Sequence, residues 1–131
     1  MKRTEIREHI FKLLFRSNFF AEDEMREQGE MYTEGLESAA DGEADTIREK
    51  ANRILEKIPE IDRMIDEVSV GWRVGRMSRV DLTILRLAVY EMKFDENVPV
   101  AVAINEAVEL ARKYGGDSSP SFVNGILAKL A

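Results

Sequence analysis

Hydrophobic residues recur at helical spacing along nearly the whole chain, and no segment alternates like a β-strand. The first twenty residues carry two apolar stripes on one predicted helix. The first stripe consists of Ile6, Ile10, Leu13 and Leu14, and the second of Phe11, Phe15 and Phe19. Two apolar faces predict either a deeply buried helix or a helix that keeps one face for a partner.

The middle of the chain predicts three further helical segments. Residues 22–44 are acidic and thinly apolar, which favours a mobile helix that ends near Asp41-Gly42. Pro59 is expected to stop the next helix and to be the first residue of the one that follows. The apolar positions of these two segments are Ile47, Ala51, Ile54, Leu55 and Ile58, then Ile61, Met64, Ile65 and Val68.

Gly71 and Gly75 mark a predicted hinge between two halves of the chain. Ser78-Arg79-Val80-Asp81 resembles a capping box, in which Ser78 caps the helix and Asp81 lies near its positive end. The helix opened by this motif is expected to bury Val80, Ile84, Leu85, Leu87, Ala88 and Met92.

The end of the chain predicts two more helices. Pro99 begins a helix that is apolar around most of its circumference, which indicates a helix surrounded by others. Gly115-Gly116 ends it, and Ser119-Pro120 supplies a cap and a first-turn proline for the last helix. The sequence therefore predicts an all-α fold, a compact bundle of about six to seven helices. We expect one domain over residues 1–131, with subdomains of roughly 1–69 and 70–131.

Composition narrows the class of protein. The 131 residues are 44% hydrophobic and 34% charged, as in ordinary globular domains. The absence of cysteine excludes a disulfide scaffold and a thiolate metal site. No apolar run approaches the ~20 residues of a membrane span, and the N-terminus lacks the apolar segment of a secretory signal. We therefore expect a cytoplasmic protein with no membrane partner.

Charge is distributed unevenly along the chain. Residues 1–20 carry five basic and two acidic groups, whereas residues 21–70 carry six basic and sixteen acidic groups. Residues 71–131 are nearly balanced, with eight and seven, and the net charge is -6. A net negative charge ordinarily argues against a nucleic-acid partner, but this distribution would let RNA use the ends of the chain while the acidic segment repels it, so any RNA binding should be weak without a helper.

Catalytic chemistry is not apparent in the sequence. No glycine-rich phosphate loop follows a strand, and the carboxylates lie mostly at solvated helix positions. His9 is the single histidine, and we expect a surface or partner-facing side chain rather than a metal ligand. These observations predict a helical binding module with no enzymatic activity, cofactor or metal.

Three motifs resemble the NusB family of transcription antitermination factors. They are VDLTILRLAVYEM at 80–92, VPVAVAINEAVELA at 98–111 and FVNGIL at 122–127. Gly71-Trp72 and Arg7-Glu8 extend the resemblance, whereas residues 20–60 share only helical character. The resemblance implies two perpendicular helical subdomains. It also implies binding to boxA, a short single-stranded element of nascent ribosomal RNA transcripts, together with the small ribosomal protein NusE. That complex joins the RNA to elongating RNA polymerase.

The resemblance also indicates RNA-binding residues. Lys2, Arg3 and Arg7 correspond to the family's arginine-rich start, whose cations meet RNA phosphates, and the alternative is a frayed, solvated terminus. A second patch follows from aromatic and polar groups that can stack on and bond to splayed bases. It comprises Lys113, Tyr114, Ser118, Ser119, Phe122 and Asn124. The alternative for Phe122 is a core position. The alternative for Asn124 and Gly125 is that they allow two helices to approach closely.

Phe15 and Asp81 match positions that face NusE in the family. The alternatives are a core position for Phe15 and a capping role alone for Asp81. Arg86 and Asn105 are expected to be satisfied structural groups, and the cations Arg73, Arg76 and Arg79 to balance the acidic segment.

Two other functions compete with the RNA-binding adaptor. A related helical domain precedes ribosomal RNA cytosine methyltransferases, but this chain shows no catalytic domain or cofactor loop. A homodimer or a purely protein-binding module with the same fold remains the alternative.

Overall fold

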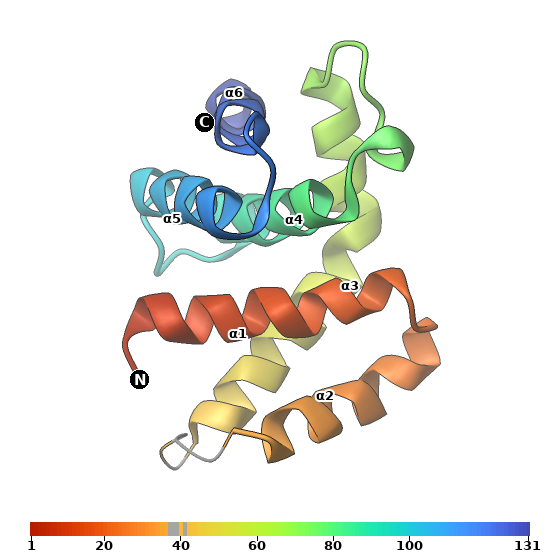
Figure 1. The fold of residues 1–131 in the computed structure, drawn as a ribbon, viewed down its shortest axis with the longest axis vertical. Helices are drawn as coiled ribbons and strands as arrows, with labels where there is room; N and C mark the ends of the chain where they lie inside the picture. The colour runs from red at the N-terminus through yellow and green to blue at the C-terminus, as the bar shows by residue number, and fades with distance from the viewer. Residues whose placement is uncertain (37–39, 41) are drawn as a thin grey trace. The chain divides into compact units, whose positions relative to one another are not determined.

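The computed structural model describes residues 1–36, 40 and 42–131. Over these ranges the chain forms six α-helices and three short 3-10 helices, with no strand (Figure 1), so the all-α prediction is confirmed. Two compact units are present, Met1–Glu56 and Lys57–Ala131. Their boundary lies inside the long helix α3 (Glu43–Val68), whereas the sequence placed a boundary near residue 69.

The first unit is built from α1 (Arg3–Phe15), the 3-10 helices η1 (Arg16–Asn18) and η2 (Glu22–Glu24), α2 (Met25–Glu34) and the start of α3. The buried face of α1 comprises Ile10, Phe11, Leu13 and Leu14. The acidic helix predicted over 22–44 is much shorter, because α2 ends at Glu34 with Gly35 as its C-cap. Asp41, where the predicted helix was to end, lies outside the described residues.

Polar contacts join α2 to its neighbours in the first unit. His9 Nδ1 lies 2.8 Å from Tyr32 Oη, and Arg16 donates a 2.9 Å hydrogen bond to Gln28 Oε1. The Arg16 guanidinium also lies 5.1 Å from the centroid of the Tyr32 ring, where cation–π attraction adds to the contact. His9 is thus half-buried and contacts Tyr32 within the first unit, so it is less exposed than a solvated surface histidine.

Helix α3 runs through Pro59 without a break, so the prediction that this proline ends a helix is wrong. A proline inside a helix removes one N–H donor and crowds the preceding turn, but it does not force the chain to stop. Ile54, Ile61 and Ile65 are fully buried at helical spacing on both sides of Pro59. Burial of this face stabilises the helical path more than the proline destabilises it.

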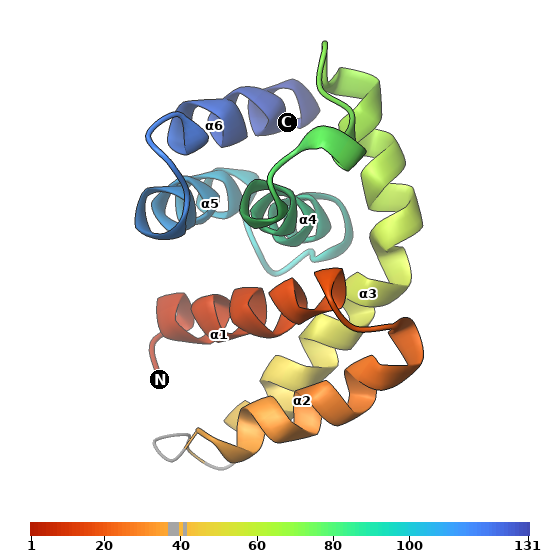
Figure 2. The same cartoon turned by 45° about the vertical axis from the view of Figure 1, so that its right-hand side comes forward.

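The second unit contains the end of α3, the 3-10 helix η3 (Val74–Arg76), α4 (Arg79–Phe94), α5 (Val100–Tyr114) and α6 (Ser119–Leu130). Helix α5 packs on both α4 and α6 (Figure 2). Helix α4 is the core of this unit, and its fully buried residues are Leu82, Ile84, Leu85, Leu87 and Val89.

A bidentate ion pair fastens α3 to α4 within the second unit. Arg86 donates to both carboxylate oxygens of Asp62, from Nε at 2.9 Å and from Nη2 at 2.8 Å. Both side chains are largely buried, where such a paired geometry is needed to offset desolvation. The structural role predicted for Arg86 is confirmed by these bonds.

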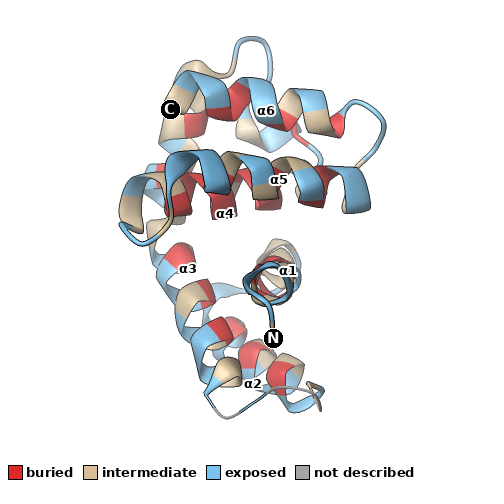
Figure 3. Ribbon diagram, turned by 90° about the vertical axis from the view of Figure 1, so that its left-hand side faces the viewer, coloured by how far each residue is buried: buried red, intermediate tan, exposed pale blue. Residues whose placement is uncertain are grey.

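Helix α5 has an open face, so the prediction of a helix surrounded by others is wrong (Figure 3). Its buried residues are Ala103, Ala107, Leu110 and Ala111. Small alanines let the neighbouring helices approach on this side alone, while Val100 and Val102 are each 40% exposed. Asn105 is also exposed, which contradicts the structural role expected for it.

No helix in the described ranges combines the length and the hydropathy that a membrane crossing requires.

We expect Pro59→Ala to raise the free energy of unfolding by about 2 kcal/mol, because the change restores a helical N–H and costs only a little unfolded-state entropy. Urea denaturation followed by circular dichroism measures the change, with the exposed helical variant Arg63→Ala as the control. An unchanged or lowered stability would instead indicate that Pro59 begins a separate helix, as the sequence suggested.

Candidate nucleic-acid interface

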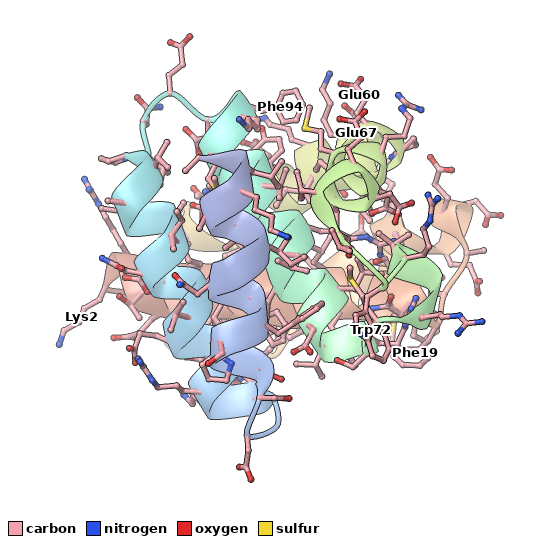
Figure 4. All side chains as sticks on the ribbon, turned by 90° about the horizontal axis from the view of Figure 1, so that it is seen from above. Lys2, Phe19, Glu60, Glu67, Trp72 and Phe94 are labelled. Atoms are coloured by element: carbon pink, nitrogen blue, oxygen red, sulfur yellow. The ribbon has the colours of Figure 1, made fainter. Side chains whose placement is uncertain are left out.

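The first candidate surface is the start of α1. Lys2 is the N-cap of this helix and Arg3 its first residue, and both are exposed. The side chain of Lys2 extends away from the ribbon in Figure 4. The Met1 amine donates a 2.6 Å hydrogen bond to Glu43 Oε2. This bond raises the pKa of the amine and lowers the pKa of Glu43, so the pair stays ionised and ties the chain down beside the two cations.

Arg7 differs from these two cations in its exposure. It lies one helical turn after Arg3 but is only 9% exposed, and it has contacts of its own. The three predicted cations therefore do not form a uniform surface. Lys2 and Arg3 present open charge, whereas most of the Arg7 side chain is packed against protein.

The second candidate surface is the corner between α5 and α6. The Gly115 N–H donates to the Ala111 carbonyl at 2.9 Å and ends α5. Ser119 is the first residue of α6, and its hydroxyl accepts a 3.0 Å hydrogen bond from the Gly116 N–H. The predicted cap at Ser119 is therefore wrong, because Ser118 occupies the N-cap position. The first-turn position predicted for Pro120 is confirmed.

Residue 115 must be glycine because its Cα lies close to the Ser119 side chain and the Ala111 carbonyl. A Cβ atom added there would lie 2.5 Å from both Cβ and Oγ of Ser119, and 2.8 Å from the Ala111 carbonyl oxygen. No other residue fits without moving the two helices apart. The corner therefore has a fixed shape, in which Ser119 is only 5% exposed and serves the turn itself.

The corner displays most of the other predicted side chains. Lys113, Ser118 and Asn124 are exposed, and Tyr114 and Phe122 are half-buried. Lys113 Nζ lies 5.5 Å from the centroid of the Tyr114 ring. The corner thus places Lys113 beside Tyr114, and the first turns of α6 carry Phe122 and the polar Ser118 and Asn124.

A hollow of about 640 Å³ lies between α5 and α6 next to this corner. Asn105, Val108, Glu109 and Arg112 line it from α5, and Pro120, Ser121 and Asn124 from α6. Of these residues only Asn124 was predicted as a site residue. The helical spacing of Asn105, Glu109 and Arg112 on one face was the available signal, but it does not show which face stays open.

The predicted partner-facing residues lie in different units. Phe15, in the first unit, is half-buried and meets the 66% exposed Phe19 edge-to-face, with ring centroids 5.3 Å apart. In the second unit, the Asp81 N–H donates to Ser78 Oγ at 3.0 Å, which is the Ser78 half of the predicted capping box. Asp81 Oδ1 is buried and has no hydrogen-bond partner among the described residues.

The basic residues before α4 have separate roles. Arg79 donates to the carbonyls of Val74 at 3.0 Å and Met77 at 2.9 Å, so it holds the loop before α4. Arg73 and Arg76 are exposed. Trp72, to which the sequence assigned no role, is 55% exposed in this loop (Figure 4).

The fold and these surfaces define a small helical protein whose candidate sites are exposed faces rather than an enclosed pocket. Within the described part, no group of three or more His, Asp or Glu side chains is placed to hold a metal ion. The model of the NusB family matches residues 4–131. Two relatives, the transcription antitermination proteins NusB from Agathobacter rectalis and Lachnoclostridium phytofermentans, are each 52% identical to this chain. Each match covers at least 98% of this chain and of the relative. The chain therefore belongs to the NusB family of transcription antitermination proteins.

Solved structures agree with this assignment. The structure of T. maritima NusB is 34% identical, covers all of this chain and 91% of its own, and superposes with a TM-score of 0.85. A crystal structure of the antitermination factors NusB and NusE in complex with dsRNA has a TM-score of 0.85 over 98% of this chain and 94% of its own. At 23% identity, this second likeness shows the fold alone.

We expect Gly115→Ala to lower the free energy of unfolding by about 1–3 kcal/mol, because the new methyl group overlaps Ser119 and the Ala111 carbonyl. Gly116→Ala is the matched control, since a Cβ atom at that position meets nothing within 4 Å. Urea denaturation of both variants gives the comparison. Equal effects of the two substitutions would show that the close approach is not what requires glycine.

Proposed function

We propose that this protein is a non-enzymatic, cytoplasmic RNA-binding antitermination factor. It binds the single-stranded boxA element of ribosomal RNA transcripts together with NusE, and the complex links this RNA to elongating RNA polymerase. The observation that carries the proposal is the closely packed α5–α6 corner, around which Lys113, Tyr114, Ser118, Phe122 and Asn124 are exposed or half-buried on a member of the NusB family.

The chemistry of this corner suits single-stranded RNA. Unpaired bases are held by stacking on aromatic rings and by hydrogen bonds to their edges. Tyr114 and Phe122 offer partly open rings, and Ser118 and Asn124 offer exposed polar groups. Lys113 supplies a positive charge for phosphate at the same place, and Lys2 and Arg3 supply two more at the start of α1.

The partner protein is proposed from a related complex and from two residues. The related NusB in one solved structure is bound to NusE and dsRNA. The aromatic pair of the half-buried Phe15 and the exposed Phe19 is suited to an apolar contact. The buried Asp81 Oδ1 lacks a donor, a state that costs about 1–3 kcal/mol. A donor from the partner would remove this cost after a small rotation of the side chain.

We expect NusE to tighten the binding of a fluorescently labelled boxA RNA to this protein, and not to tighten that of a scrambled RNA. The reason is that the acidic segment 21–70 opposes RNA until a partner adds contacts. Fluorescence anisotropy with and without NusE measures both affinities.

Asp81→Ala should reduce the gain in RNA affinity that NusE provides, and should leave the weak binding of RNA to this protein alone unchanged.

If neither the boxA RNA nor the scrambled RNA binds, with or without NusE, the RNA-binding proposal is wrong. The alternative of a protein-binding or homodimeric module would then gain support, with Phe19, Phe20 and Met31 as its exposed apolar residues.

Charge reversal at the start of α1 tests the interaction with RNA phosphates. We expect Arg3→Glu to weaken boxA binding and to flatten the plot of log Kd against log salt by about 0.7 for each phosphate that is no longer neutralised. Arg53→Glu is the control, because Arg53 is also exposed but lies on the acidic segment. A slope equal to that of the unmodified protein would show that Arg3 does not touch RNA.

A further inference from the structure

The side chains of α5 and α6 leave a hollow between the two helices. Its α5 wall is a single helix face, with Asn105, Val108, Glu109 and Arg112 at helical spacing. Its α6 wall is Pro120, Ser121 and Asn124. Each wall carries polar side chains and one half-buried apolar residue, Val108 on α5 and Pro120 on α6.

Two carboxamides line this hollow without internal partners. Asn105 comes from α5 and Asn124 from α6, and both are exposed. Neither side chain makes a hydrogen bond to another described residue. By contrast, Arg112 and Glu109 form an ion pair within α5, so the one carboxylate in the walls is neutralised locally.

The geometry points to a pocket for a single unstacked RNA base in this hollow, with Asn105 and Asn124 hydrogen-bonding to the base edge. This inference rests on the proposed RNA-binding function and extends its surface beyond the α5–α6 corner. An asparagine carboxamide carries a donor beside an acceptor, the pattern that pairs with the edge of a base. Unpaired bases are recognised in this way in single-stranded RNA.

The position of the hollow favours a nucleotide over a protein segment. It adjoins the corner through Asn124, which belongs to both, and through Arg112, which precedes the corner residue Lys113. A strand that contacts Lys113 and Ser118 at the corner would therefore reach the hollow with its next nucleotides. The exposed Lys113 lies at this end and supplies a positive charge for their phosphates, whereas the charge of Arg112 is paired with Glu109. A peptide anchor would instead require a mainly apolar hollow.

The experiment combines a protein variant with a set of modified RNAs. Labelled boxA RNAs, each without the base at one position, are titrated by fluorescence anisotropy in the presence of NusE. The same RNAs are titrated against Asn105→Ala, and against Asn97→Ala as the matched control. Asn97 is exposed in the loop before α5 and does not line the hollow.

We expect Asn105→Ala to weaken the binding of intact RNA about tenfold, because the hydrogen bonds to a base edge are removed. Removal of the base at one position should weaken binding to the unmodified protein by a similar factor, and should weaken the Asn105→Ala variant no further. This non-additivity is specific to a contact between the residue and that base. Asn124→Ala should show the same coupling at the same position, and Asn97→Ala at none.

Two results would overturn the inference and leave the proposed function intact. One is full affinity of Asn105→Ala for boxA RNA, and the other is additive effects at every position. A fall in NusE affinity without any coupling to an RNA base would assign the hollow to a protein. Failure of the unmodified protein to bind boxA RNA at all would overturn both the base pocket and the proposed function.

Discussion

The contact between Gly115 and Ser119 fixes the direction in which α6 leaves α5. The two helices meet so closely that a Cβ atom on residue 115 would overlap the Ser119 side chain. The Ser119 hydroxyl accepts a hydrogen bond from the Gly116 N–H, which closes the turn. Every candidate RNA contact in the second unit depends on this geometry. Tyr114 precedes the turn, and Ser118 and Phe122 lie within or just after it. The backbone of such a corner loses little conformational entropy when a flexible strand binds, because packing and the turn hydrogen bond already fix it.

Electrostatics divides the chain into regions with different tasks. Acidic residues outnumber basic ones by ten over residues 21–70, while the first twenty residues carry an excess of three positive charges. The exposed cations Lys2 and Arg3 follow a terminal amine that is itself held by Glu43. A protein with net negative charge attracts RNA only where local cations dominate, within about 8–10 Å at physiological salt. This distribution favours RNA binding that depends on a partner, and it limits non-specific binding to other RNA.

Polar groups inside helices have contrasting roles in this protein. Arg86 lies among apolar residues of α4. It donates two hydrogen bonds to Asp62, which give its side chain a structural role. Asn105 is set in a similarly apolar stretch, yet it lies on the open face of α5 beside a hollow. From the sequence the two residues were indistinguishable, because helical spacing gives the relative angle between side chains but not which angle faces solvent. The helices packed around each residue make the distinction.

Much of the fold follows from local rules. The helical periodicity, the Ser78 cap and the first-turn position of Pro120 are set by bonds within a few residues, so the sequence alone predicted them. The family motifs over 80–127 are equally local, and they identified the family and the α5–α6 corner. Packing decided the rest. Helix α3 continues through Pro59 because a buried isoleucine face outweighs a local helix breaker, and Ser119 serves the turn because Gly115 lies against it. Arg7 is mostly buried and Asn105 exposed for the same reason, since burial depends on residues distant in sequence. The sequence determined that the chain is helical and where its last three helices lie, and only the tertiary structure decided how far α3 extends and which helix faces remain open to a partner.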